Sequence, residues 1–319
     1  GTGFIGEDAG DWAGYCVAGA GDVNGDGYDD ILIGAYKDED GGAEAGQTYL
    51  FLGNSSGWSG NTIISNADAS WWGESAYDYS GYSVAGAGDV NGDGYDDILI
   101  GAYGDDDGGA LAGQTYLILG KGSGWEMDAD LSDADASFIG EGGGDNAGRR
   151  VAGAGDVNND GYDDILIGSY WNSGGGGTAG QTYLIFGKSA GWEMDVALAN
   201  VDASFLGENG LDYSGGAIAG TGDVNGDGFD DILIGASGND EGGNSAGQTY
   251  LIFGSSSGWI MDFELTNASA SFIGEAADDT AGYSVSGAGD VDGDGYDDIL
   301  IGAKGNDDGG VGSGQAYLI

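Results

Sequence analysis

The chain repeats one pattern of apolar and polar residues five times. Each copy has a segment of small residues, an unbroken apolar run and a third segment of β-branched and aromatic residues; the first copy places them at residues 14–21, 30–35 and 46–53. A fourth apolar segment, residues 69–74, follows after a longer polar connection. Short apolar runs bounded by glycine and polar turns are typical of β-strands, and no segment keeps a helical period over three turns. The pattern therefore predicts four strands per repeat and an all-β chain.

The copies follow one another at a constant spacing of 67 residues. Four-stranded units repeated at such a period are typical of β-propeller blades. We therefore expect a five-bladed β-propeller of four-stranded antiparallel blades, formed as a single domain over residues 1–319. The expected blades are approximately residues 8–74, 75–141, 142–208, 209–275, and 276–319 together with 1–7.

The two ends of the chain complement each other in this scheme. Residues 4–7 have the sequence of a fourth strand without the first three strands before it, and residues 315–319 have that of a third strand without a fourth after it. Pairing the N-terminal strand with the C-terminal blade would close the ring and remove exposed sheet edges. Small residues such as Ala18–Gly21 suit the first strand of each blade, because the innermost strands converge on the axis.

An acidic segment between the first and second expected strands carries the clearest chemistry. Residues 22–30 read DVNGDGYDD, with oxygen-bearing side chains at positions one, three, five and nine and glycine at position six. Calcium takes six to eight oxygen ligands, and such alternation wraps a short loop around it. Glycine at position six allows the positive φ of a sharp turn. The expected ligands are Asp22, Asn24, Asp26, the backbone carbonyl of Tyr28, and both carboxylate oxygens of Asp30.

We call this segment and its four copies the acidic loops: residues 22–30, 89–97, 156–164, 223–231 and 290–298. The corresponding ligand positions are Asp89, Asn91, Asp93, Tyr95 and Asp97; Asp156, Asn158, Asp160, Tyr162 and Asp164; Asp223, Asn225, Asp227, Phe229 and Asp231; and Asp290, Asp292, Asp294, Tyr296 and Asp298. We therefore expect about five structural Ca²⁺ ions. An EF-hand is excluded because position twelve is the apolar Ile33 rather than glutamate. Simple polar turns are the alternative, but they would leave four carboxylates within nine residues without counter-charge.

Composition narrows the function classes. The net charge is −49, with six basic residues and no histidine, so nucleic acid and anionic membrane surfaces are excluded as partners. Without histidine, Ser-His-Asp and Cys-His catalysis are excluded as well. The single cysteine, Cys16, forms no intramolecular disulfide. No apolar run is long enough to insert into a membrane. The chain starts at Gly1 without a signal peptide, as expected for an excised or processed domain, and its acidity fits an extracellular or salt-rich setting.

The repeats, summarised as AGYSVAGAGDVNGDGYDDILIGA…AGQTYLIFG, resemble the FG-GAP repeat of integrin α-subunit propellers and their bacterial relatives. The resemblance covers nearly the whole chain and implies a calcium loop between the first and second strands of each blade. It also implies a cell-surface or extracellular module for protein interaction or adhesion. The chain departs from the family pattern in three ways. Alanine or serine replaces the Phe of "FG" (Ala13 in the first copy), and Tyr36 or another residue replaces the Pro of "GAP". Integrin propellers have seven blades, whereas this chain has five copies.

A ligand surface is expected at the end of the blades opposite the acidic loops. There the connections between fourth and first strands carry acidic pairs such as Glu7 with Asp11, and the connections between second and third strands carry acidic turns such as residues 38–40. Aromatic rings at this end could stack on sugars or hold a cationic group. They belong to Trp12, Tyr79, Tyr103, Trp171 and Tyr213.

Several functions fit this surface. A protein-interaction module and a carbohydrate-binding propeller are the first two. A polysaccharide-acting enzyme fits less well, because the acidic pairs recur in every blade whereas catalysis needs one asymmetric site. The last is a spacer without a ligand inside a larger surface protein. The surface residues could also serve only to bond turn amides. We expect the recurring Trp58, Trp125, Trp192 and Trp259 to fill gaps between blades.

Overall fold

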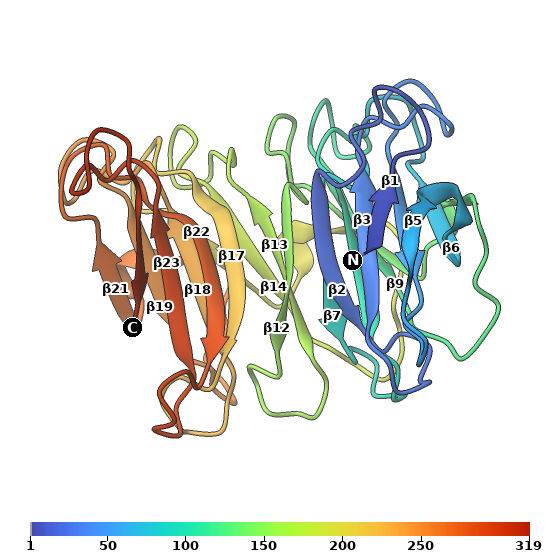
Figure 1. The fold of residues 1–319 in the computed structure, drawn as a ribbon. Coiled ribbons are helices and arrows are strands. Elements are labelled where there is room, and N and C mark those ends of the chain that lie inside the picture. Colours follow the sequence, from blue (N-terminus) through green and yellow to red (C-terminus); the bar gives the residue numbers. More distant parts are fainter. Residues whose placement is uncertain (1) are drawn as a thin grey trace. The chain divides into compact units, whose positions relative to one another are not determined.

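The computed structural model describes residues 2–319, which form β-strands joined by loops and turns (Figure 1). The helices in these residues are 3₁₀ turns of three residues each, and none has the length and apolar character needed to cross a membrane. The chain divides into two compact units. The first contains residues up to 151 together with 188–198, and the second contains residues 152–187 and 199–319.

The first unit contains two large sheets built on the same plan. One has the order β10-β6-β4-β3-β2 and the other β15-β11-β9-β8-β7. Their antiparallel strands are β2 (Cys16–Gly21), β3 (Asp30–Ala35), β4 (Gln47–Phe51) and β6 (Ala69–Trp72), and then β7 (Ser83–Gly88), β8 (Asp97–Ala102), β9 (Gln114–Ile118) and β11 (Ala136–Ile139). The register Val17–Ile33 recurs as Val84–Ile100 in the second sheet. These sheets match the first two predicted blades.

The second unit repeats the plan three times. Its sheets have the orders β12-β13-β14-β16-β20, β17-β18-β19-β21 and β22-β23-β24. The strands are β12 (Arg150–Gly155), β13 (Asp164–Ser169), β14 (Gln181–Ile185), β16 (Ala203–Leu206), β17 (Ser214–Gly222), β18 (Asp231–Ala236), β19 (Gln248–Ile252), β21 (Ala270–Ile273), β22 (Ala281–Gly289), β23 (Asp298–Ala303) and β24 (Gln315–Leu318). The all-β prediction and the five repeats of mostly antiparallel strands are confirmed, and they are consistent with five propeller blades.

Short parallel strands were not predicted. They are β10 (Ala129–Asp130), β15 (Val196–Ala197) and β20 (Phe263–Glu264), each followed by a 3₁₀ turn: η2 (Leu131–Asp133), η3 (Leu198–Asn200) and η4 (Leu265–Asn267). Each pairs in parallel with the fourth strand of the preceding repeat, namely β6, β11 or β16. At the start of the chain β5 (Gly60–Ile63), followed by η1 (Ile64–Asn66), pairs in the same way with β1 (Thr2–Ile5). In its pairing with β5, β1 therefore takes the place that β6, β11 and β16 take in their pairings with β10, β15 and β20.

Side-chain hydrogen bonds hold each short strand against the preceding repeat. The Asp128 amide donates to Ser70 Oγ at 2.7 Å, and Ser70 Oγ donates to the Asp128 carboxylate at 3.0 Å. The amide of Asp195 bonds Ser137 Oγ at 2.7 Å, and the amide of Asp262 bonds Ser204 Oγ at 2.8 Å. Strand pairing and these bonds together link successive repeats along the chain.

The core lies between neighbouring sheets within each unit. The tyrosines at one equivalent position, Tyr49, Tyr116, Tyr183 and Tyr250, are among the largest fully buried side chains. The recurring tryptophans fill gaps as expected: the ring centroids of Trp125 and Trp71 lie 6.1 Å apart, and those of Trp192 and Phe138 lie 6.5 Å apart.

The first strands of neighbouring sheets approach closely. A Cβ added at Gly86 in β7 would lie 3.0 Å from the carbonyl oxygen of Ala20 in β2, and one at Gly220 in β17 would lie 2.7 Å from that of Ala154 in β12. The small residues of this strand are therefore required by the close packing of the strands, as predicted.

Candidate metal centres

The acidic loops connect the first two antiparallel strands of each repeat, as predicted. Gly27 has φ +88° and its counterparts Gly94, Gly161, Gly228 and Gly295 have φ between +91° and +96°, so glycine at position six meets a real backbone requirement. In the third loop Asn159 replaces glycine at position four and adopts φ +56°. Asparagine tolerates this left-handed conformation better than most residues do.

The side chains at positions one, three and five bind backbone amides of their own loop. The Asp26 amide donates to Asp22 Oδ1 at 3.0 Å and to Asn24 Oδ1 at 2.8 Å. The Gly27 amide donates to Asp22 Oδ2 at 2.8 Å, and the Tyr28 amide donates to Asp26 Oδ1 at 3.0 Å. The fourth loop has the same bonds within about 0.1 Å. These bonds turn the predicted ligand side chains toward one short stretch of backbone.

The carboxylate at position nine lies below the loop and is buried. Asp30 is 0% exposed, as are Asp97, Asp164 and Asp231. Asp30 Oδ2 accepts from the Val23 amide at 2.9 Å and Asp30 Oδ1 from the Gly53 amide at 2.6 Å. Burial raises the pKa of Asp30 to about 6, that of Asp97 to about 7 and that of Asp164 to about 8. Each oxygen keeps a second lone pair, so metal binding through both oxygens of Asp30 stays a prediction.

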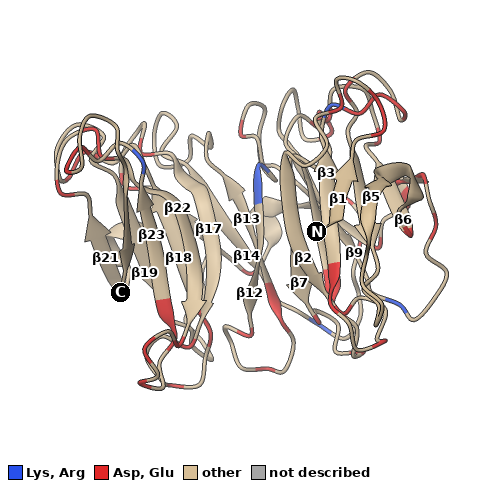
Figure 2. Ribbon diagram, viewed as in Figure 1, with Lys and Arg blue, Asp and Glu red and all other residues tan. Residues whose placement is uncertain are grey.

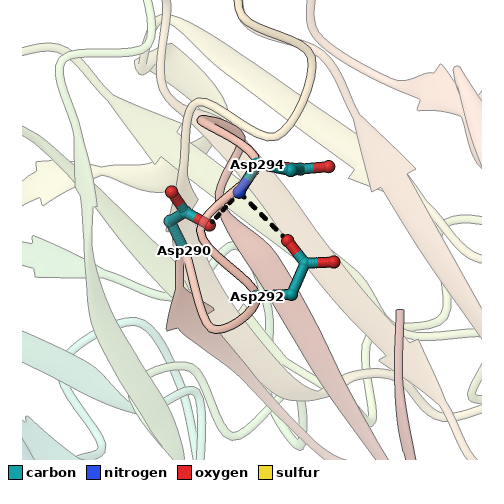
Figure 3. Close-up of side chains that lie close together, drawn as sticks. All are labelled: Asp290, Asp292 and Asp294. Carbon is teal, nitrogen blue, oxygen red and sulfur yellow. Dashed lines mark hydrogen bonds between the residues drawn. The ribbon is translucent and has the colours of Figure 1, made fainter.

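The donor set fits a hard cation. In the fifth loop the carboxylate oxygens of Asp290, Asp292 and Asp294 lie within 4.8 Å of one another (Figure 3). In the third loop Asn158 Oδ1 is buried and accepts no hydrogen bond, and a bound cation would satisfy it. Carboxylate, amide and carbonyl oxygens are the ligands of Ca²⁺. When bound, the ion would neutralise part of the charge of the loop carboxylates. Figure 2 shows acidic residues concentrated in the loops at both ends of the strands.

The sequence pattern of the FG-GAP repeat matches the chain five times, at residues 14–51, 80–118, 147–185, 214–252 and 281–319. Each match begins just before or within the first strand of a repeat and ends at its third strand, so every acidic loop lies inside one.

The chain belongs to the FG-GAP repeat family.

The relatives of this FG-GAP chain include integrin α subunits. Integrin alpha pat-2 of Caenorhabditis elegans is 32% identical over 73% of this chain, and integrin alpha-V of Gallus gallus is 30% identical over 72%. Integrin alpha-IIb of Mus musculus is 34% identical over 52%. These alignments cover only 18%, 20% and 15% of the respective relatives. The chain therefore matches a small part of each integrin subunit.

Three of the predicted ligand-surface residues come together in the first unit of the FG-GAP chain. Tyr79 and Tyr103 stack with ring centroids 5.1 Å apart and an interplanar angle of 8°. Trp12 joins them through Tyr36, whose ring lies 5.8 Å from that of Trp12 and 6.1 Å from that of Tyr79. Tyr15 and Tyr82 complete the group, with a hydrogen bond of 2.8 Å between their hydroxyls. We call these six residues the aromatic cluster.

Basic side chains lie against the aromatic cluster. Lys37 Nζ is 5.4 Å from the centroid of the Trp12 ring, and the Arg149 guanidinium is 5.0 Å from that of Tyr82. Sequence reasoning missed Tyr15, Tyr36, Tyr82 and both cations. Tyr15 and Tyr82 occupy equivalent positions in successive repeats, and this recurrence of an aromatic residue could have identified them.

The remaining two predicted ligand-surface residues lie in the second unit. Trp171 and Tyr213 both contact Tyr170, at centroid distances of 5.3 Å and 6.1 Å. Tyr213 has φ +56°, close to the values of +59° for Trp12 and +57° for Tyr79. Bulky residues seldom adopt positive φ, and such strain is concentrated at functional sites.

A second acidic cluster recurs at the end of each repeat opposite its acidic loop. The two connections were predicted to share this end of the repeat, and in the second repeat they are hydrogen-bonded: the Gly104 amide donates to the Asp78 carbonyl at 3.0 Å. Burial, reinforced by neighbouring carboxylates, raises the pKa of Glu74 and Asp78 to about 7 and that of Asp105 to about 6. In the fourth repeat Asn239 replaces Asp105 and donates to Asp212 at 3.0 Å, and in the fifth Asn306 donates to Asp279 at 3.2 Å.

Replacing Asp105 by Asn is therefore expected to stabilise the protein at neutral pH. The folded-state pKa values of Asp78 and Asp105 lie above the unfolded value near 3.8, so the folded state binds more protons and loses stability as the pH rises from about 4 to 7. We expect Asp105→Asn to raise the melting temperature by about 2 °C or more at pH 7.5 in saturating calcium, with little gain at pH 5. The exposed Asp133→Asn is the control. An equal gain at both pH values, or a loss at pH 7.5, would contradict this assignment.

Proposed function

We propose that the chain is a calcium-stabilised five-bladed β-propeller, formed as a single domain over residues 1–319, that serves as an extracellular protein-interaction or adhesion module. The observation that carries the proposal is the fivefold recurrence of a loop whose carboxylates accept backbone amides, with the aspartate at position nine fully buried in four of the five copies. Membership of the FG-GAP family and similarity to integrin α subunits support a module exposed at the cell surface.

Calcium would have a structural role in this protein. Each acidic loop joins two strands of one sheet. Its position-nine aspartate accepts one amide from within the loop and one from just after the third strand, as Asp30 does with Val23 and Gly53. An ion bound in the loop would keep this buried carboxylate ionised and fix the hairpin. Binding would therefore be coupled to folding, with one ion per blade.

Contacts of β1 support closure of the ring. The Phe4 ring lies 4.6 Å from that of Phe51 and 5.9 Å from that of Trp58. The fourth strands β6, β11 and β16 make the same kind of aromatic contact with the repeat that follows, for example Phe205 with Trp259 at 6.2 Å. Because β1 packs as a fourth strand, it needs a third strand beside it, and β24 is a third strand without a fourth in its sheet.

Exposed apolar faces also favour closure. Val17 is 65% exposed, whereas its counterpart Val84 is 4% exposed; Leu318 is 53% exposed, whereas Leu50 is fully buried. Leu50 and Val84 belong to the same core cluster, in which the face of one repeat packs on the next. By this repeat relation, the face containing Leu318 is the natural partner of the face containing Val17.

A carbohydrate-binding propeller is the second candidate. A cleft of about 600 Å³ beside Trp12 is lined by Glu7, Asp11, Lys37, Asp38 and Glu44, among others. An exposed indole next to acidic acceptors is a suitable platform for a sugar ring, and the 57% exposure of Trp12 leaves its surface accessible. The recurrence of the acidic pairs in every blade argues against catalysis. The net charge of −49 argues against nucleic acid as a partner.

Removing calcium is expected to lower the melting temperature strongly. A site at 100-fold excess over Kd contributes about 2.7 kcal/mol, so several sites together would contribute as much as the whole usual stability of a domain. The measurement is a thermal melt in millimolar calcium, in excess EGTA and after calcium is restored, combined with metal analysis. We expect about five bound ions, and about four for Asp26→Ala. An unchanged melting temperature with no bound calcium would overturn the calcium role.

Closure is tested by a disulfide between the chain ends. The register Leu50–Ala69, repeated as Leu117–Ala136 and Leu184–Ala203, would place Leu318 opposite Thr2. Residues opposite each other in a sheet are close enough for a disulfide. In a Cys16→Ser background, Thr2→Cys with Leu318→Cys should oxidise to an intramolecular bond in the monomer. Pairing Thr2→Cys with Val311→Cys is the control. Failure of the first pair to oxidise would contradict closure without affecting the calcium role.

The two candidate functions are separated by probing immobilised extracellular proteins and glycans with the purified chain. A protein-interaction module is expected to bind members of the protein panel in calcium and to lose them in EGTA. A lectin would bind glycans instead, and Trp12→Ala would reduce that binding at least tenfold. The control Tyr77→Ala removes an exposed tyrosine outside the aromatic cluster. If the chain binds neither the protein panel nor the glycan panel, both candidate functions are contradicted and a spacer role is favoured.

A further inference from the structure

One aspartate in each acidic loop has no role among the predicted ligands. It stands at position eight, between the carbonyl expected at position seven and the buried carboxylate at position nine; in the second loop it is Asp96. Asp96 points to the preceding loop. The Asp22 amide donates to Asp96 Oδ2 at 2.7 Å, and the Asp96 amide donates to the Asp22 carbonyl at 3.3 Å.

The second unit contains the same pair of bonds twice. The Asp156 amide donates to Asp230 Oδ2 at 2.9 Å and the Asp223 amide to Asp297 Oδ2 at 3.0 Å. The return bonds, from the amides of Asp230 and Asp297 to the carbonyls of Asp156 and Asp223, are both 3.3 Å long. In all three pairs the bonded residue is the first predicted ligand of the preceding loop.

Two glycines make room for this contact. Gly21 has φ +77°, and a Cβ there would collide with the Asp96 carboxylate; Gly155 and Gly222 stand in the same relation to Asp230 and Asp297. In the first pair of loops the Tyr95 ring, next to Asp96 in sequence, packs on Gly25 of the preceding loop, where a Cβ would lie 2.6 Å from Tyr95 Cε1. Positions seven and eight of one loop therefore both pack on the loop before it.

We propose that in these three pairs the aspartate at position eight is a positioning residue that couples its own calcium site to the site in the preceding loop. Its carboxylate fixes the backbone of the first ligand in the preceding loop and places a negative charge next to that site. Calcium in its own loop would immobilise positions seven and nine on either side of it, and so preorganise the contact. Filling one loop thus raises the affinity of the loop before it, and the coupling is reciprocal. The proposal rests on the proposed calcium binding.

The test is a calcium titration in competition with a fluorescent chelator, with thermal melts of the calcium-free proteins. Asp96→Ala removes both the hydrogen bond and the charge, whereas Asp96→Asn keeps an acceptor and loses only the charge. We expect Asp96→Ala to weaken one site at least tenfold and Asp96→Asn to weaken it less. Asp133→Ala removes the same charge from an exposed position outside the acidic loops and should change nothing.

A double-mutant cycle separates positioning from a purely structural role. In an Asp26→Ala background, where the first loop has lost a ligand, Asp96→Ala should cause no further loss of calcium affinity. If Asp96→Ala changes only the calcium-free melting temperature, or lowers affinity equally in both backgrounds, the coupling is overturned. If wild-type protein binds calcium and Asp96→Ala binds it unchanged, the coupling again fails while the calcium role stands. If wild-type protein binds none, the calcium role itself fails.

Discussion

Repulsion between carboxylates is the constraint on which the other features depend. The five acidic loops hold 21 of the 55 acidic residues, and in each loop the carboxylates at positions one and five accept bonds from a few backbone amides. Amides neutralise only part of this charge. The buried carboxylate at position nine makes the conflict sharper, because desolvation penalises its ionised form. A divalent cation bound in the loop would reduce both the repulsion and the desolvation cost, and the proposed metal, the loop and the hairpin would then form one structural unit.

Carboxylates also lie close together at the opposite end of each repeat, where hydrogen bonds from neighbouring side chains stabilise them. There the buried carboxyls of Asp78 and Asp105 lie beside the Tyr116 hydroxyl, which donates to Asp105 at 3.4 Å. In the last three repeats asparagine stands in the place of Asp105, and in the fourth and fifth repeats it donates to the remaining carboxylate. A neutral donor is tolerated here because the group closes a turn and binds an amide. At a metal ligand position the same exchange would remove charge from the site.

The periodicity of the sequence made the elements within one repeat predictable, but it did not predict the contacts between repeats. The 67-residue spacing identified the strands and acidic loops, because each is specified within its own repeat. The two-residue strand β10 escaped prediction, since it depends on the bond from Asp128 to Ser70, 58 residues away. The period also showed that Asp96 recurs, but not that it reaches Asp22, 74 residues earlier. The aromatic cluster combines rings from two repeats with Arg149 from a third, a grouping that no spacing encodes.

The repeats diverge at the end where a ligand surface is proposed and agree in the acidic loops. The acidic loops are nearly identical in all five copies, as expected if each serves its own blade. Residues 12, 79, 146, 213 and 280 share a left-handed backbone, with φ between +54° and +59°, yet they are Trp, Tyr, Asn, Tyr and Thr. The fold imposes the same backbone strain at every copy and leaves the side chain free to vary. If this end of the repeats binds a ligand, as proposed, each repeat would offer it different chemistry, and such asymmetry is what selective recognition by a repetitive scaffold requires.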